Sequence, residues 1–392
     1  MSMPGRSPAR RGQQLEWIPQ PGSNVLLLSQ RNVEHVVAYC AQYEFEDVVA
    51  SVVDADMATP KALDGVEASR KAYKLIRYAS GSRHLAGALV RPFLPEVLEK
   101  DYDLFLPIFS HVHQLFALSC IPEWRKRCRK AVCVIQEAWD HMLPGYLLEL
   151  LSEFDHVFIG AQHVIATVSK MIGRPCSYMT QGVDTLRFCS WPDPPVRSID
   201  VCNIGRRSPV THARLMESAR EGRIFYYYDT IKPNAKQVTF QVSNGAEHRL
   251  LLANLLKRSK YFIANRARAN EPEVTRGREE ISGRYVEGAA AGTIILGDPP
   301  DLEEFRQHFD WADAVIQMPF DAPDVMARIE QLEADPARQA RIRKDNATNA
   351  MLRHDWVHRL RTILDVVGIG PPPRMLAREA RLKSLADAIR RS

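Results

Sequence analysis

The stretch EEISGRYVEGAAAGTIILGD, residues 279–298, has residue types and a spacing that suit phosphate chemistry. Ser282 is a good helix N-cap, and the pattern predicts a helix over residues 283–291 that ends at Gly292. Free backbone N–H groups and the positive end of the helix dipole make such an N-terminus a natural seat for phosphate. Arg284, in the first turn, adds a guanidinium that can bind two phosphate oxygens at once.

Glu287 lies one turn inside this predicted helix, where a carboxylate would repel a phosphate unless it binds something else. The two hydroxyls of a ribose suit it, because a carboxylate accepts two hydrogen bonds side by side. The following run, residues 293–296, predicts a buried strand against which the thin alanine-rich helix can pack. Together these features indicate a nucleotide site beside a central sheet.

Short apolar runs alternate with helical patterns along the chain, which is typical of parallel βαβ units. In the first half, strands are expected at 24–29, 102–110, 130–140, 156–161 and 176–184. A further strand is expected near the end of the apolar run at 45–53. In the second half, strands are expected at 199–205, 222–229, 260–266, 293–296 and 312–318. The pattern therefore predicts two doubly wound α/β domains, residues 23–188 and 199–370. A linker at 189–198, with three prolines in SWPDPPVRS, joins them.

The two ends of the chain differ from this pattern. Residues 1–22 are basic and rich in Pro, Gly, Ser and Arg, without the apolar core of a signal peptide, and are expected to be disordered. Residues 371–392 form a basic amphipathic helix whose apolar stripe is expected to pack back on the first domain. The alternative for this helix is peripheral contact with an anionic membrane.

The composition is that of an ordinary globular protein, with 45% hydrophobic and 25% charged residues. A net charge of +5 from 52 basic and 47 acidic residues is too mild to indicate stable nucleic-acid binding. The seven cysteines show no paired metal-ligand spacing, so we expect reduced thiols in a cytoplasmic protein. No apolar run reaches the roughly 18 residues of a membrane-spanning helix.

The motifs resemble those of the retaining GT-B glycosyltransferases of the group-one superfamily. The signature of that family is Glu, seven residues, Glu, an Ala/Gly-rich helix and a short apolar strand, which Glu279, Glu287 and the run EGAAAGTIILGD match. TQGVDTLRF, residues 180–188, is similar to the family's NGVDxxxF segment, and CNIGRRSP, residues 202–209, is similar to its Gly-Arg strand end. The resemblance covers most of residues 24–366 and is greatest to the compact, spore-protein-like branch.

This resemblance implies the GT-B fold, an α/β architecture of two Rossmann-like doubly wound domains facing a cleft. It implies transfer of a sugar from a nucleotide-sugar donor, with retention, without a metal and without a further cofactor. The acceptor stays open: a saccharide, lipid, metabolite, protein or nucleic acid.

The family's roles can be placed residue by residue. The resemblance assigns the ribose to Glu287 and the hydroxyls of the donor sugar to Glu279, with neighbouring Glu280 as the alternative. It assigns the diphosphate to basic residues after the first strand of the second domain and near the motif helix. Family members also have a lysine a short distance after the arginine at that strand end, and this sequence has none there. The candidates for binding the donor's diphosphate are therefore Gly205, Arg206, Arg207, Arg266, Arg268, Gly283 and Arg284.

Residues of the first domain complete the expected site. The family often has a histidine after an apolar strand that contacts the donor sugar, for which FSHVHQ offers His111 and His113. Asp140 is a candidate acceptor-side base. Each candidate also has a plain structural alternative, as a solvated loop acid, a strand-end arginine or a structural histidine.

Two other functions can be compared with this sequence. An NAD-dependent oxidoreductase would have a glycine-rich turn after its first strand, and LLLSQRNVEH, residues 26–35, contains no glycine. A non-catalytic protein that binds nucleotide sugars fits the same motifs and remains the alternative. The acidic pair Asp54 and Asp56 has the spacing of a metal clamp, but it lies too early in the first domain to serve the proposed donor site.

Overall fold

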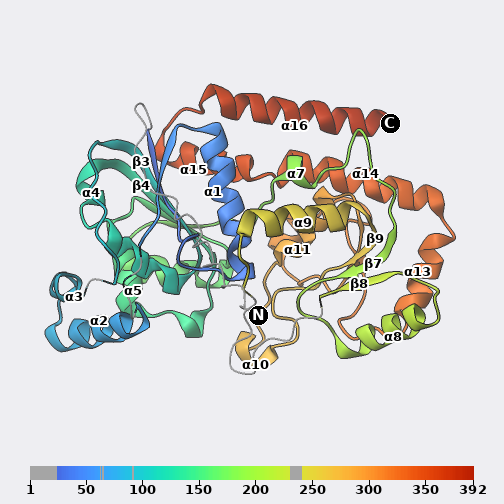
Figure 1. Cartoon of the computed structure of the whole chain (residues 1–392), viewed down its shortest axis with the longest axis horizontal. Helices are drawn as coiled ribbons and strands as arrows, with labels where there is room; N and C mark the ends of the chain where they lie inside the picture. The colour runs from blue at the N-terminus through green and yellow to red at the C-terminus, as the bar shows by residue number, and fades with distance from the viewer. Residues whose placement is uncertain (1–23, 62, 64–65, 91, 230–240) are drawn as a thin grey trace, which may run out of the picture.

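The computed structural model of this chain describes residues 24–61, 63, 66–90, 92–229 and 241–392. Two α/β domains lie side by side, and one long C-terminal helix runs across both of them (Figure 1). The segment 1–22, expected to be disordered, lies outside the described residues.

The N-terminal domain is built on a six-stranded parallel sheet in the order β2-β1-β3-β4-β5-β6. Its strands are β1 Val25–Leu28, β2 Ala55–Ala58, β3 Tyr102–His111, β4 Cys128–Glu137, β5 His156–Ile159 and β6 Cys176–Tyr178. The strand β1 is buried along its whole length, because helices cover both faces of the sheet. Its continuous apolar sequence is therefore what this position requires.

Helices and short 3-10 turns connect these strands. They are η1 Val37–Tyr39, α1 Cys40–Val52, α2 Val66–Ser80, α3 Arg83–Leu89, η2 Val112–Cys120, α4 Trp124–Arg127, η3 Asp140–Met142, α5 Gly145–Leu148, η4 Glu149–Glu153, η5 Gln162–Val164, α6 Ile165–Ile172 and α7 Thr185–Phe188. The run at 45–53, expected to lead into a strand, is the C-terminal part of α1, and the strand follows at β2.

The C-terminal domain has a five-stranded parallel sheet in the order β11-β10-β9-β7-β8. Its strands are β7 Ile199–Asn203, β8 Tyr226–Tyr228, β9 Ser259–Ile263, β10 Ile294–Gly297 and β11 Ile316–Gln317. Its helices are α8 Pro209–Arg220, α9 Gly245–Lys257, α10 Pro272–Thr275, α11 Gly283–Ala290, α12 Glu303–His308, α13 Val325–Glu333, α14 Pro336–Arg353 and α15 Trp356–Val367. The strand order reverses between β7 and β9, which is where ligands of such sheets bind.

The last helix, α16 Pro373–Arg391, packs on the N-terminal domain. Met375, Leu382 and Ile389 are fully buried in a hydrophobic cluster that also holds side chains of β1, α1 and β3. The apolar stripe of this helix is thus used inside the molecule. None of the helices in the described residues is both long and apolar enough to cross a lipid bilayer.

An ion-pair cluster fixes α16 to the segments that join the domains. Arg378 donates to both carboxylate oxygens of Asp355, at 2.8 and 2.7 Å, and to Asp184 at 2.7 Å. Asp355 is completely buried and also accepts from the backbone and hydroxyl of Thr185. The carboxylate therefore depends on Arg378 for its countercharge.

Replacing this arginine should destabilise the protein. Arg378→Ala would leave Asp355 buried without a cation, which costs about 3–5 kcal/mol when one partner of a buried pair is removed. We expect a fall of several degrees in melting temperature by differential scanning calorimetry, and almost none for Arg381→Ala, an exposed arginine of the same helix. Equal melting temperatures for both variants would contradict this role.

Candidate functional site

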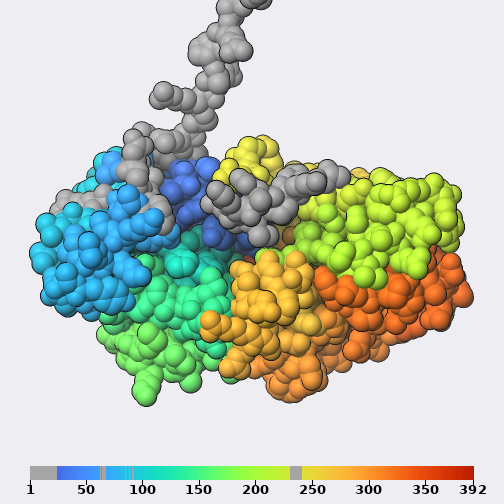
Figure 2. Space-filling view, turned by 90° about the horizontal axis from the view of Figure 1, so that it is seen from below, coloured from blue at the N-terminus to red at the C-terminus, as the bar shows by residue number. Residues whose placement is uncertain are grey.

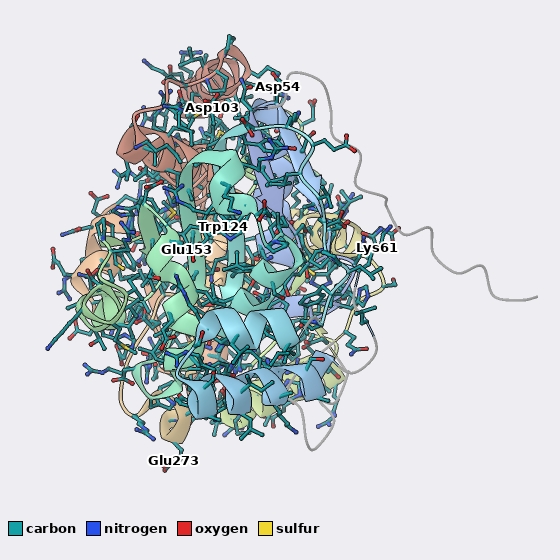
Figure 3. The ribbon with its side chains drawn as sticks, turned by 90° about the vertical axis from the view of Figure 1, so that its left-hand side faces the viewer. Asp54, Lys61, Asp103, Trp124, Glu153 and Glu273 are labelled. Carbon is teal, nitrogen blue, oxygen red and sulfur yellow. The ribbon has the colours of Figure 1, made fainter. Side chains whose placement is uncertain are left out.

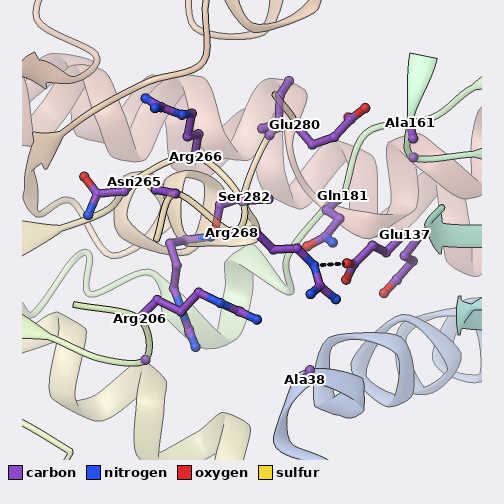
Figure 4. A pocket seen from close by; sticks show the side chains of 18 of the residues that line it. Ala38, Glu137, Ala161, Gln181, Arg206, Asn265, Arg266, Arg268, Glu280 and Ser282 are labelled. Carbon is purple, nitrogen blue, oxygen red and sulfur yellow. Dashed lines mark hydrogen bonds and ion pairs between the residues drawn. The ribbon is translucent and has the colours of Figure 1, made fainter. Parts of the chain in front are cut away.

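A cavity opens where the carboxyl ends of the two sheets face each other (Figure 4). From the N-terminal domain it is lined by residues at or just after the ends of β4 and β5: Gln136, Glu137, Ala138, Trp139, Gly160 and Ala161. From the C-terminal domain it is lined by Ile204, Gly205 and Arg206 after β7, by residues 265–269 after β9 and by residues 280–284 at the start of α11. This interdomain cavity is the place where sheets of this topology bind ligands.

Helix α11 begins as the sequence predicts, with its N-terminus at the interdomain cavity. The Ser282 hydroxyl caps it by accepting from the backbone N–H of Arg284 at 3.3 Å, and Gly292 adopts the left-handed conformation, with φ +60°, just beyond its end. A Cβ on Gly288 would come within 2.9 Å of the Phe262 ring, so glycine lets α11 lie close to the sheet. The close approach holds the first turn of α11 beside the strand ends.

Four arginines converge on the interdomain cavity, and each pairs with carboxylates. Arg206 contacts Glu271 at 3.1 Å, Arg268 contacts Glu137 at 2.8 Å, and Arg284 contacts Glu287 at 2.7 Å. The fourth, Arg266, pairs with Asp298 and Glu279. Figure 4 shows three of these side chains, Arg206, Arg266 and Arg268, with the Arg268–Glu137 pair marked. A bound anion would compete with these carboxylates for the same donors.

Gly205 and Arg207 are held by Asp229, which follows β8. Gly205 has φ +87°, and its backbone N–H donates to the Asp229 carboxylate at 3.1 Å. The Arg207 guanidinium donates to the same carboxylate and lies over the Tyr228 ring, 5.4 Å from its centroid. Unlike Arg206, Arg207 does not line the interdomain cavity.

Glu287 lies behind this cavity, buried in a chain of charges that crosses between the domains. One oxygen accepts from Arg284 at 2.7 Å, and the other accepts from Arg249 of α9. Arg249 also donates to both oxygens of Glu44 in α1, at 2.8 and 3.0 Å. Burial alone would raise the pKa of Glu287, but Arg284 and Arg249 hold it below its ordinary value.

Sequence reasoning missed Arg249 and Glu44. The available signal was an arginine within the apolar helical run AEHRLLLANLL, because a buried charge needs a partner elsewhere. Such a signal does not identify the partner, which lies 205 residues away.

Of the two adjacent acids at 279 and 280, Glu280 lines the interdomain cavity. Its carboxylate contacts Nδ1 of His163, from the other domain, at 2.6 Å, and burial raises the pKa of Glu280. Glu279 turns toward the loop after β10, where it accepts from the backbone N–H of Asp301 at 2.7 Å. The geometry thus favours Glu280 over Glu279 as the cavity acid.

The candidate residues of the first domain lie around the interdomain cavity without lining it. His111 is the last residue of β3 and lies beside Glu137 of β4. Its ring stacks on the ring of His113, with 4.9 Å between the ring centroids. Burial lowers the pKa of His111 to about 4, against the opposing effect of Glu137. Asp140, in η3, is half exposed and contacts His141 at 3.3 Å and Arg278 at 3.7 Å.

The acidic pair Asp54 and Asp56, at the start of β2, is separated from the site. Asp54 pairs with Arg374 of α16, while buried Asp56 contacts Lys100 and the Tyr102 hydroxyl, each at 2.8 Å. Both lie toward the amino-terminal end of their strand, the opposite edge from the interdomain cavity. Within the described ranges, no three His, Cys, Asp or Glu side chains are grouped to hold a metal.

Several cavity residues were not expected. Trp139 lies beside the Arg268 guanidinium, 5.8 Å from its ring centroid, and its indole N–H donates to Glu137 at 2.7 Å. Asn265 and Gln181 also line the cavity. Trp139, Asn265 and Gln181, like Glu137, lie in the C-terminal halves of the segments predicted as strands, which was the signal available.

Comparison with known proteins finds one family model and several solved structures that resemble this chain. Residues 241–365 match the family model described as glycosyl transferase-like. HepE of Anabaena, solved in complex with UDP and glucose, matches with a TM-score of 0.50 at 12% identity, over 88% of this chain and 99% of its own. Sucrose-phosphate synthase of Thermosynechococcus elongatus matches with a TM-score of 0.48 at 10% identity, over 88% and 98% of the two chains. No curated protein sequence matches this one. The two-sheet topology and the likeness to HepE confirm the expected GT-B fold.

The buried charge chain generates a stability prediction. Arg249→Met would leave Glu44 and Glu287 buried without their shared cation, at a cost of about 3–5 kcal/mol. Calorimetry should show a clear drop in melting temperature, and Arg258→Met, at the exposed end of α9, should show little change. The triple variant Arg249→Met with Glu44→Gln and Glu287→Gln should recover part of the loss, because neither of the two buried carboxylates then carries a charge without its shared cation.

The same chain predicts a pH dependence. Because the pKa of Glu287 is lowered in the folded state, its ionised form adds stability above the ordinary carboxyl pKa, and this is lost as the pH falls through the folded pKa. The difference in free energy of unfolding between wild type and Arg249→Met should therefore become smaller at acidic pH. A gap that stays constant from neutral to acidic pH would contradict an electrostatic origin.

Proposed function

This chain has the GT-B fold and carries a glycosyltransferase-family domain, and we propose that it transfers a sugar from a nucleoside-diphosphate donor to an acceptor bound on the N-terminal domain. The observation that carries the proposal is the arrangement of the interdomain cavity. The capped N-terminus of α11 and the arginines 206, 266, 268 and 284 meet there at the carboxyl ends of the two sheets. Helix N-termini and arginine forks are the groups that bind diphosphate.

In this proposal the donor lies mainly on the C-terminal domain. The diphosphate would take the N-terminus of α11 at Gly283 and the guanidinium of Arg206, the cavity arginine with 39% of its side chain exposed. Glu287 would accept from the ribose hydroxyls, since Arg284 and Arg249 already keep it ionised and fixed. Glu280 would contact the donor sugar, because it is the acid that reaches the cavity.

We propose a retaining, metal-independent transfer. The bond from the anomeric carbon to the leaving phosphate oxygen breaks while the acceptor oxygen bonds to the same face, and the acceptor proton passes to the departing phosphate. The charge that develops on the diphosphate is stabilised by fixed donors already present, the backbone N–H groups of α11 and the arginines. No nucleophile from the protein is required on this route.

A direct test uses a panel of UDP, GDP, ADP and TDP, each alone and with its sugars. A ligand that binds the folded state raises the melting temperature, so a true donor nucleotide should stabilise the protein. UDP is the first to test, because HepE, which shares the fold, was solved with UDP and glucose. Release of nucleoside diphosphate in the presence of EDTA would support metal-independent turnover, and activity that needs added magnesium or manganese would overturn that part.

The second candidate function is a non-catalytic protein that binds nucleotide sugars, favoured by the ion pairs that occupy every cavity arginine. Donor binding without hydrolysis or transfer to any acceptor would establish it. Turnover of the donor excludes it.

The assigned ribose contact gives a point prediction. Glu287→Gln should weaken binding of the stabilising nucleotide by roughly 10- to 100-fold, since a hydrogen bond to a charged group contributes about 1.5–3 kcal/mol. Isothermal titration calorimetry measures this directly. Glu330→Ala, an exposed glutamate of α13, should bind as wild type does. Unchanged affinity in a folded Glu287→Gln protein would remove Glu287 from the site.

A further inference from the structure

One surface of the N-terminal domain, far from the interdomain cavity, exposes an unusual set of apolar side chains. Its members are Leu63, Leu75, Tyr78, Leu85, Leu89, Leu94 and Val97, with Leu75 at 71% and Val97 at 75% exposure. Helices α2 and α3, which carry four of them, contact each other and lie side by side on the outside of the domain (Figure 3). Single exposed apolar residues are ordinary, but a cluster of this kind marks an interaction surface.

Helix α2 is apolar on two sides. Tyr73 and Ile76 face the core of the N-terminal domain. Leu75 and Tyr78, three residues apart and so on one face, point to solvent, as Leu85 and Leu89 do on α3. The core accounts for the first pair. Of the second, Tyr78 contacts the Tyr146 ring edge-on but stays mostly exposed, as Leu75 does. We name these four exposed residues and the lysines beside them the α2–α3 surface.

The charge of this segment is strongly one-sided. Residues 66–90 contain five Lys or Arg and a single acidic residue, in a chain whose whole net charge is +5. Arg77 and Arg83 pair with Glu149 and Glu153. Lys71 and Lys74 are exposed next to Leu75 and Tyr78, and neither forms an ion pair with any residue that the structure describes. The Lys74 ammonium lies over the Tyr146 ring, 5.9 Å from its centroid. Lysines without an acidic partner that flank exposed apolar side chains are complementary to an anionic, partly apolar partner.

A cavity of about 330 Å³, lined by apolar side chains and by the Arg83–Glu153 ion pair, lies against α2 and α3. Tyr73 of α2 and Gly87 of α3 line it together with the aromatic side chains of Phe93, Phe116 and Trp124. Figure 3 labels Trp124 and Glu153, two of the residues that line this cavity.

We propose that the α2–α3 surface binds an anionic lipid bilayer. Leu75, Tyr78, Leu85 and Leu89 would enter the headgroup region, while Lys71 and Lys74 contact lipid phosphates. This combination of an apolar face and flanking lysines is that of helices lying in the membrane interface. A fluid interface adapts to leucines spaced between lysines, whereas a protein partner would need a matching acidic surface.

This surface differs from the C-terminal helix, for which the sequence left peripheral membrane contact as the alternative to packing on the first domain. The apolar stripe of α16 is buried against the N-terminal domain and is therefore not available to lipid. Figure 2, seen from below, shows the α2–α3 region in light blue on the same side of the molecule as α10, which lies at the edge of the C-terminal domain near the interdomain cavity.

The test uses the full-length protein and vesicles of phosphatidylcholine, alone or mixed with an equal part of phosphatidylglycerol. Wild type should sediment with the anionic vesicles and far less with the neutral ones, and high salt should release it. Lys71→Gln with Lys74→Gln should lower the partition coefficient roughly 30-fold, since each lysine near an anionic surface contributes about 1 kcal/mol. Leu75→Ser with Tyr78→Ser should also lower it, with an unchanged melting temperature.

The matched control is Val366→Ser with Leu376→Ser, two half-exposed apolar residues on α15 and α16, which should bind as wild type does. Glu287→Gln should also bind vesicles normally, so the result is independent of the proposed transfer. Equal binding to both vesicle types, or wild-type binding by the α2–α3 variants, overturns the proposal. So does a wild-type dimer that Leu75→Ser with Tyr78→Ser dissociates, which would make this surface an interface between two copies.

Discussion

A single buried guanidinium, that of Arg249, connects the two domains and the motif helix. It lies between Glu44 of α1 and Glu287 of α11, above the ring of Phe188, which ends the segment leading into the linker. Glu44 in turn accepts from the indole of Trp356 at 3.1 Å and from the backbone of Asp184 at 2.8 Å. Helices from three parts of the chain therefore share one charge, and the position of α11 relative to the N-terminal domain depends on it.

Two further polar contacts cross between the domains at the interdomain cavity. Arg268 reaches Glu137, and Glu280 reaches His163. These contacts close the cavity with the same groups that a charged ligand would use. A diphosphate that binds Arg268 would break the ion pair between Arg268 and Glu137. Because that pair joins the two domains, ligand binding would be coupled to the distance between them.

The sequence predicts this fold well because its main signals are local. Continuous apolar runs identify strands such as β1 and β9, and the Ser282 cap with Gly292 defines α11. Interactions between distant segments were not predictable. Nothing local to Arg249 indicates Glu44, and the choice between Glu279 and Glu280 depends on how one loop turns toward His163. His111 and Asp140 were reasonable candidates by position, but strand length and loop direction leave them outside the cavity lining.

The last helices of the chain pack on its first domain, and this affects the order in which the two domains can finish folding. Side chains of α14, α15 and α16, from Ala347 to Ile389, complete the hydrophobic cluster that covers β1 and β3 on one face. During synthesis α1 covers part of that face, and the rest stays exposed until α14, α15 and α16 have been made. Domains usually fold in the order of synthesis. Here all strands of the C-terminal sheet, up to β11, are made before the helices α14, α15 and α16 that pack on the first domain. The domain that begins first is finished last, and a nascent chain halted before α16 exposes an apolar sheet face to chaperones.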